Sequence, residues 1–347
     1  MAYTTIDDPS VYFQAQTYTG NGSDGLAVTN TGNSDLQPDW LWIKKRSGSG
    51  QHVLVDSTRG TNKQLFSSLT DVEQTSTNFV ASLDSDGFTV NDSSSGTGDT
   101  NATNGGTYVA WQWKANGGTT SSDSNGSITS TVQANTTAGF SIVTWTGSGT
   151  SNETVGHGLT TAPEVVILKP RTESRHWLIW FDALGDNDKA FLFNDETAAD
   201  NRFGPNAPTS SVFGLYSNQG NRDGTTFVAY AFHSVKGYSK IGSYTGNNST
   251  DGVFVYTGFK PAWLMVKKTD GTANWDITTA AISQNQIDER LRANLSNAEE
   301  SSGYVDFLSN GFKMRNTNGS QNNGSYIYMA FAEHAFVSSK GVPVTAR

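Results

Sequence analysis

Three sequence landmarks recur along this chain in a fixed order, and they constrain its fold more than any other feature. Each round opens with an aromatic residue followed by Thr-Gly, continues with a stretch from a proline to a lysine, and closes with an aromatic-rich stretch. The three rounds are Tyr18-Thr-Gly20, Pro38–Lys44 and Tyr108–Trp113; Trp145-Thr-Gly147, Pro163–Lys169 and Phe227–Phe232; and Tyr244-Thr-Gly246, Pro261–Lys267 and Tyr326–Phe331. Pro163 and Pro261 lie 98 residues apart, and Phe232 and Phe331 lie 99 apart. A fixed period of this length predicts three diverged copies of one unit of roughly 100 residues.

The first interval is longer than the second, and its extra residues fall in one stretch. Residues 116–138 are mostly Gly, Ser, Thr, Asn and Asp, with almost nothing apolar, which is typical of a flexible linker. Units two and three are joined almost without a gap at Lys236-Gly-Tyr238. We therefore expect unit one at 1–115, a linker at 116–138, unit two at 139–236, and unit three with a C-terminal tail at 237–347. Units two and three should be docked, with unit one on a longer connection.

The residues of the landmarks favour strands over helices. Among 347 residues there are 18 Phe, 12 Tyr, 9 Trp and 36 Gly, and only 16% are charged, which is strand and turn chemistry. The proline-to-lysine stretch is apolar on both faces and so predicts a central strand, whereas the closing stretch has one bulky face. The sequence predicts an all-β fold of three tandem β-sandwich or jelly-roll-like units with short helical turns, arranged in series. The alternative is a single closed structure made from all three units.

Short helical turns are predicted where a Thr or Ser precedes an acidic residue by three positions. Such pairs begin at Thr70, Thr197 and Ser296. Ile287, Leu291 and Leu295 recur every four residues, which predicts a longer helix in the third unit.

Charge and cysteine content exclude several classes of protein. The chain has no Cys, which rules out disulfides and thiolate metal sites. Its net charge is −9, with scattered Lys and Arg, which argues against nucleic-acid binding. The N-terminus lacks the basic and apolar regions of a signal peptide, and no apolar run approaches the ~18 residues needed to cross a bilayer. We expect a soluble chain without membrane insertion.

No set of residues predicts catalysis, a cofactor or a metal site. None of the five histidines falls at a position shared by all three units, and His52 with Asp56 sits in a strand-like run. The carboxylates Asp84 and Asp86 flank a turn rather than forming an evident glycosidase pair. Asp186-Asn-Asp188 has ligand atoms suited to calcium but no bidentate acid downstream. The sequence therefore predicts a protein that is not an enzyme, with no cofactor and no metal.

The tryptophans offer the one candidate for ligand binding. Five of them lie in the predicted core strands: Trp40, Trp42, Trp111, Trp113 and Trp263. Trp177, Trp180 and Trp275 lie in less regular stretches and are candidate surface rings for stacking on a sugar. The competing interpretation is that these three rings also belong to the core.

Several phrases of the chain resemble a family of tailed-bacteriophage repeat proteins, often from marine phages, that are usually labelled tail fibre or virion structural protein. The phrases are Phe140–Gly147, Val155–Leu159 leading to Pro163, Lys236–Gly246, Phe254–Trp263 and Tyr326–Phe331. The resemblance covers nearly the whole chain and implies a place in the virion beside other virion proteins. We expect the chain to be made in the host cytoplasm. It carries no catalytic residues to transfer. Many tail fibres have a long N-terminal shaft, which this chain lacks.

These observations lead to one main functional hypothesis and two alternatives. The main hypothesis is a non-enzymatic virion structural protein in a tail fibre or appendage, acting in host-surface glycan attachment as a homotrimer. One alternative is a capsid decoration or head fibre protein with a structural role. The other is a depolymerase of surface polysaccharide, which would need a cleft with two carboxylates.

Overall fold

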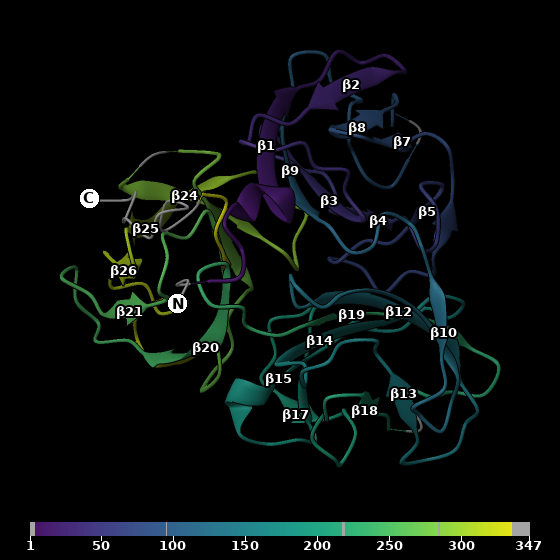
Figure 1. Ribbon diagram of the computed structural model, residues 1–347. Helices are drawn as coiled ribbons and strands as arrows, with labels where there is room; N and C mark the ends of the chain where they lie inside the picture. The colour runs from purple at the N-terminus through teal and green to yellow at the C-terminus, as the bar shows by residue number, and fades with distance from the viewer. Residues whose placement is uncertain (1–3, 95, 217–218, 284, 335–347) are drawn as a thin grey trace.

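The chain folds almost entirely into strands. A computed structural model describes residues 4–94, 96–216, 219–283 and 285–334 (Figure 1). Within these ranges there are 27 strands and two short 3-10 helices, η1 (Pro9–Val11) and η2 (Asp182–Leu184). The all-β prediction is confirmed. No helix among the described residues is both long enough and apolar enough to pass through a bilayer.

Three main sheets contain the same order of four strands. The order β1-β9-β3-β4 in the first sheet is matched by β12-β19-β14-β15 in the second and β20-β27-β22-β23 in the third. The first group consists of β1 (Phe13–Thr19), β9 (Thr107–Trp113), β3 (Trp40–Lys45) and β4 (Val53–Asp56). The second consists of β12 (Phe140–Thr146), β19 (Thr226–Phe232), β14 (Val165–Pro170) and β15 (Leu178–Phe181), extended by β16 (Lys189–Leu192) and β17 (Asp200–Asn201). The third consists of β20 (Ser239–Thr245), β27 (Ser325–Phe331), β22 (Trp263–Lys268) and β23 (Asp276–Thr279), extended by β24 (Ile287–Arg292).

The strand register also agrees between the three groups. The last residue of β9, Trp113, pairs with Phe13 on one side and with Trp40 on the other. Phe232 at the end of β19 pairs with Phe140 and Val165, and Phe331 at the end of β27 pairs with Ser239 and Trp263. The proline-to-lysine strands β3, β14 and β22 are internal in their sheets, as their two apolar faces predict. Below, residues 4–115, 139–236 and 237–334 are called segments one, two and three.

Smaller strand groups cover the outer face of each main sheet. They are β2 (Leu26–Thr29), β8 (Gly87–Val90) and β7 (Val80–Asp84) in segment one; β13 (Thr154–Gly156) and β18 (Val212–Gly214) in segment two; and β25 (Glu300–Leu308), β26 (Gly311–Met314) and β21 (Phe254–Tyr256) in segment three. Each encloses its own apolar cluster with the main sheet. A further pair, β5 (Lys63–Gln64) and β6 (Gln74–Thr75), lies in segment one.

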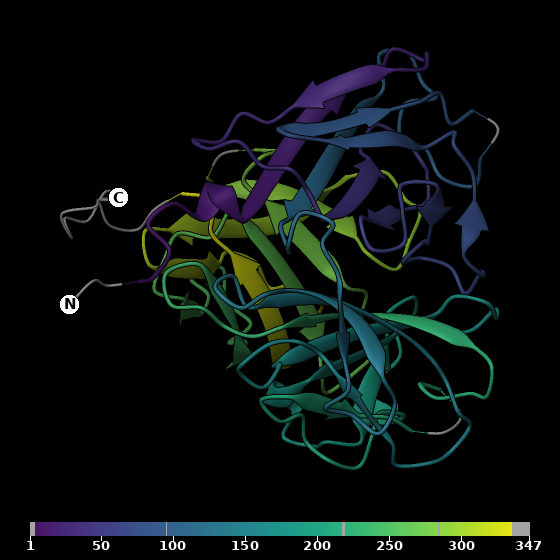
Figure 2. The same cartoon turned by 45° about the vertical axis from the view of Figure 1, so that its right-hand side comes forward.

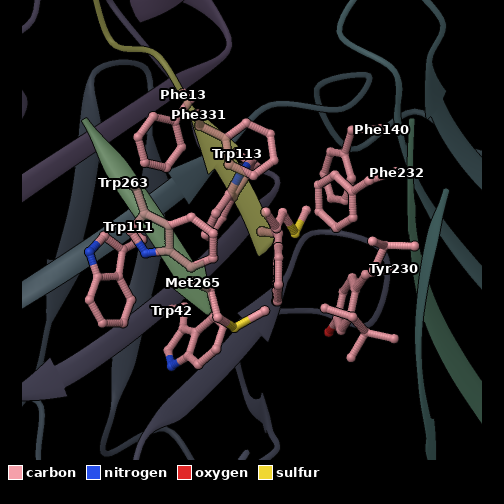
Figure 3. Packing of buried hydrophobic residues seen from close by; sticks show 14 of the residues in the cluster. Phe13, Trp42, Trp111, Trp113, Phe140, Tyr230, Phe232, Trp263, Met265 and Phe331 are labelled. Carbon is pink, nitrogen blue, oxygen red and sulfur yellow. The ribbon is translucent and has the colours of Figure 1, made fainter. Parts of the chain in front are cut away.

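The inner faces of the three main sheets meet in one shared core (Figure 3). The Trp40 and Tyr230 rings stack with centroids 4.3 Å apart, which joins segments one and two. Phe331 of segment three lies 5.4 Å from Phe13 and 5.7 Å from Phe232. The expectation of three units in series is therefore wrong, and the closed alternative holds. The physical reason is that each sheet has one bulky aromatic face, and these faces bury one another.

The segments contact one another in a cycle, seen as three groups of strands around a common centre in Figures 1 and 2. The residue just before β4, β15 or β23 donates a ring N–H to a backbone carbonyl of another segment. The donor–acceptor pairs are His52 Nε2 to Arg292 O at 2.9 Å, Trp177 Nε1 to Phe66 O at 2.9 Å, and Trp275 Nε1 to Leu192 O at 3.4 Å. Segment one thus contacts three, two contacts one, and three contacts two, which closes the ring within a single chain.

Residues 116–138 are not the unstructured linker that their composition suggested. They contain β10 (Ser121–Asp123) and β11 (Ser130–Asn135), and β11 pairs along the edge of β12. The buried Gln133 amide donates to the hydroxyls of Ser57 and Thr58 in segment one. A strand between two polar surfaces is held by backbone pairing and side-chain hydrogen bonds, so it needs few apolar residues.

The helical predictions are wrong at the positions they named. Residues 70–73, 197–200 and 296–299 contain no helix, and Ile287 and Leu291 belong to strand β24. A spacing of four residues fits the two-residue repeat of a strand as well as a helical turn, so this pattern could not distinguish them.

Candidate functional site

The three tryptophans predicted to bind glycan are buried. Trp177 and Trp275 have no measurable exposure, and both indoles donate to a carbonyl of the neighbouring segment. Trp180 is 1% exposed and stacks on Phe203 at 5.5 Å. The prediction of surface rings is therefore wrong, because Trp177 and Trp275 turn inward against another segment and Trp180 packs in the apolar cluster of its own segment. The core interpretation holds for all three.

Three buried lysines end the proline-to-lysine strands and join the segments. Each Nζ contacts one carbonyl of its own segment and one of another: Lys44 meets Lys45 O and Ser296 O, Lys169 meets Arg175 O and Thr70 O, and Lys267 meets Ala273 O and Glu196 O. Burial lowers the pKa of Lys169 to about 7, and those of Lys44 and Lys267 to about 8. Each amine can donate to both of the carbonyls around it. These lysines have a structural role at the interfaces.

The histidines considered as general bases are also held by structural hydrogen bonds. The Trp42 indole donates to Nδ1 of His52 at 2.7 Å, so Nε2 carries the proton that meets the Arg292 carbonyl. His157 accepts from the Leu159 amide at Nδ1, and its Nε2 lies 3.1 Å from the Thr209 carbonyl. Burial lowers the pKa of both rings. Neither geometry is that of a base oriented by a carboxylate.

The buried carboxylates belong to ion-pair networks between strands and segments. Asp56 and Glu73 both bind Arg59, and Glu73 also binds Arg171 of segment two at 2.8 Å. Burial would raise the pKa of Glu73, but Arg171 and Arg59 hold it below its ordinary value. In the remaining acidic loop, Asp186 pairs with Lys189 at 3.1 Å. No group of three His, Asp or Glu suited to a metal ion occurs in the part of the chain that the structure describes.

A different set of aromatic rings is exposed, on the outer strands of segment three. Phe254 and Tyr256 lie two residues apart on β21 and are 43% and 60% exposed, so they share the outer face of that strand. Tyr304 on β25 is 40% exposed and has a backbone φ of +41°, which is rare for a bulky residue. We call Phe254, Tyr256 and Tyr304 the aromatic surface.

Charged groups lie between these rings. Lys313, which pairs with Phe254 across β21 and β26, binds Asp251 at 2.6 Å. Arg315 binds Asp306 on β25 at 2.6 Å and reaches Asp251 at 3.4 Å. Lys313 holds the pKa of Asp251 below its ordinary value, so the carboxylate is charged at neutral pH. Flat apolar rings beside exposed hydrogen-bonding groups can stack on the apolar face of a sugar and bind its hydroxyls.

One family model matches this chain over residues 8–335, and its description is Domain of unknown function (DUF7483). The chain belongs to the DUF7483 family. No curated protein and no solved structure matches it.

The described residues of the other two segments of this DUF7483 chain contain no counterpart of the aromatic surface. In segment one, β2 pairs with β8 in the register that β21 has with β26, so Ala27 and Thr29 take the places of Phe254 and Tyr256. In segment two, β13 presents Thr154 and Gly156. The signal in the sequence was the alternation Phe254-Val-Tyr256 on a short strand. Val255 fills the buried face of the strand, so the two aromatic rings are left on its exposed face.

Proposed function

We propose that this chain is a non-enzymatic structural protein of a phage virion, in a tail fibre or similar appendage, and that it binds host-surface glycan. The phrases shared with phage repeat proteins support the place in the virion. The observation that carries the glycan proposal is the aromatic surface, whose Phe254 and Tyr256 are exposed beside the ion pairs of Lys313 and Arg315. Large exposed rings grouped on one face are a typical sign of a binding surface.

The buried ionisable groups are held in structural hydrogen bonds and ion pairs, which supports a binding function over an enzymatic one. The buried lysines and His52 are hydrogen-bonded between segments, and Arg59 with Asp56 closes a buried pair. Such groups stabilise one rigid arrangement, whereas a general base needs access to a substrate proton.

We also propose that the three segments are copies of one β-sandwich-like unit, with boundaries near those of the sequence repeat. The shared strand order and register support this. Only the third copy then carries the glycan-binding rings. A homotrimer of the chain would present three such surfaces and so raise weak single-site affinity through multivalency.

The test is replacement of the exposed rings. The double variant Phe254→Ala/Tyr256→Ala should weaken binding of the protein to host envelope polysaccharide at least about tenfold, since central aromatic contacts typically contribute 1–2 kcal/mol or more. Virions carrying it should adsorb more slowly. Tyr216→Ala, which removes a ring 45% exposed in segment two, is the matched control and should bind as the wild type does.

Equal binding by the double variant and the wild type, at an unchanged unfolding midpoint, would show that the aromatic surface does not bind the polysaccharide. Sugar release from the polysaccharide by the wild-type protein alone would contradict the non-enzymatic proposal.

A further inference from the structure

Each main sheet has its first strand beside a turn of another segment, and this places three equivalent clefts around the ring. The Ser57–Thr58 turn after β4 faces the edge of β12, η2 after β15 lies beside β20, and Ala280 and Ala281 after β23 line a cleft with β1. Among the residues that the structure describes, β11 is the strand found in the first of these clefts, and no strand lies in the other two.

The filled cleft shows how a strand fits there. β11 runs antiparallel to β12, with Thr131 opposite Thr144 and Gln133 opposite Ile142. The Gly147 amide donates to the carbonyl of Thr225, just before β19, so alternate residues of β12, Thr144 and Ile142 among them, direct their backbone groups toward β11. The side chain of Gln133 closes the other wall through Ser57 and Thr58.

The cleft between β20 and η2 lies at the corresponding edge of the third sheet, and none of the strands that the structure describes pairs with that edge. Its volume is about 620 Å³, and its walls include Ala183 and Leu184 on one side and Ser243 and Thr245 on the other. The Gly246 amide donates to Gly324 beside β27, so the backbone groups of Ser243 and Thr245 point outward. Both residues are exposed, and these outward groups bond to none of the residues that the structure describes. Ser243 therefore occupies the position that Thr144 has under β11.

The corresponding edge of β1 is already partly closed. The outward amide of Ala15 donates to the carboxylate of Glu333. This side chain occupies the place where a strand would pair.

We propose that the edge of β20 is a docking site for an extended strand of a partner polypeptide, paired antiparallel in the register that β11 has on β12. The partner strand would have the chemistry of Ser130–Asn135, with hydroxyl and amide side chains alternating with small or β-branched apolar ones. Unpaired backbone donors and acceptors at strand spacing recognise another backbone.

The experiment uses the intact chain and a labelled peptide that copies residues 128–136. Binding should be saturable at concentrations up to about 1 mM, and it should slow hydrogen exchange at the amides of Ser243 and Thr245. N-methylation of the peptide at the positions of Thr131 and Gln133, whose amides face the acceptor strand, should weaken binding at least tenfold. N-methylation at the positions of Val132 and Ala134 should change it less than threefold, because those amides face away.

Two protein variants locate the site. Ser243→Pro removes the outward amide without touching the bonds to β27 and should abolish peptide binding, since proline is tolerated on an edge strand when its nitrogen faces outward. Thr17→Pro makes the same change on β1 and should leave binding unchanged. The N-methylated peptides keep the test valid if Ser243→Pro lowers the unfolding midpoint.

Three results would overturn the proposal: no binding at the highest peptide concentration, binding insensitive to the position of the methyl group, or protection on β1 instead of β20. Self-association of the chain through β20, without peptide binding, would make a second copy the occupant and would also overturn it.

Discussion

Lys169 shows how single side chains join the segments. Its Nζ lies 2.6 Å from the Arg175 carbonyl in its own segment and 3.0 Å from the Thr70 carbonyl in segment one, and its side chain is fully buried. Burial favours the neutral amine, which lowers its pKa to about 7 from 10.5. Between those two values the unfolded chain binds a proton that the folded chain does not. Stability therefore rises with pH across this window and falls as the pH drops toward 7.

The wild type should become more stable relative to Lys169→Met as the pH rises from 7 to 9. The difference between their free energies of unfolding measures this change. The growth is at most about 1.4 kcal/mol per pH unit, the linkage limit for one proton. Urea unfolding of both proteins at several pH values measures it. Lys189→Met, at an exposed lysine, is the control for replacing a lysine by methionine. Parallel profiles for Lys169→Met and the wild type would mean that Lys169 stays charged when folded.

At the scale of elements, β11 decides how the first two segments connect. Its Gln133 side chain is buried, accepts from the amides of Asn116 and Gly118, and donates to two hydroxyls of segment one. The neighbouring Thr131 exposes its side chain. The strand is thus anchored through one side chain as well as through its backbone.

Gln133→Ala should lower the free energy of unfolding by about 1–3 kcal/mol, because it leaves several buried polar groups without partners. Thr131→Val keeps a β-branched residue at an exposed position and should change it by less than about 0.5 kcal/mol. Chemical denaturation of both variants gives the comparison. Equally small effects would indicate that residues 116–138 are a linker after all.

The elements differ in how well the sequence predicted them. The proline-to-lysine strands were predictable because two apolar faces require burial on both sides. β11 was not, since its partners are hydroxyls and backbone groups that composition does not reveal. The inward turn of Trp177 and Trp275 depends on carbonyls more than 80 residues away, so local sequence could not separate a surface ring from a core ring. The alternation around Phe254 and Tyr256 is visible in the sequence, but only the exposure of the two rings in the structure identifies them as a candidate site.

For the whole molecule, the repeat predicted three sheets but not how their faces meet. A sandwich in series and a closed ring both need strands with one bulky buried face, so the two give the same alternation in sequence. The ring is closed by contacts between the first and third segments, among them the paired side chains of Arg46 and Glu299 at 2.7 Å and the stacked rings of Phe13 and Phe331. Segment one is consequently held by both neighbours and by the shared core.

Closure of three segments around one core is tested most directly by cutting the chain between segments one and two. A protease recognition sequence inserted between Thr119 and Thr120, which are both exposed, allows complete cleavage of the folded protein. Size-exclusion chromatography with light scattering then measures the mass of the product under native conditions. We expect a single particle with the mass of the uncut protein, because the aromatic core and the ion pairs hold segment one in place. Elution of segment one as a separate species after cleavage would contradict the closed ring.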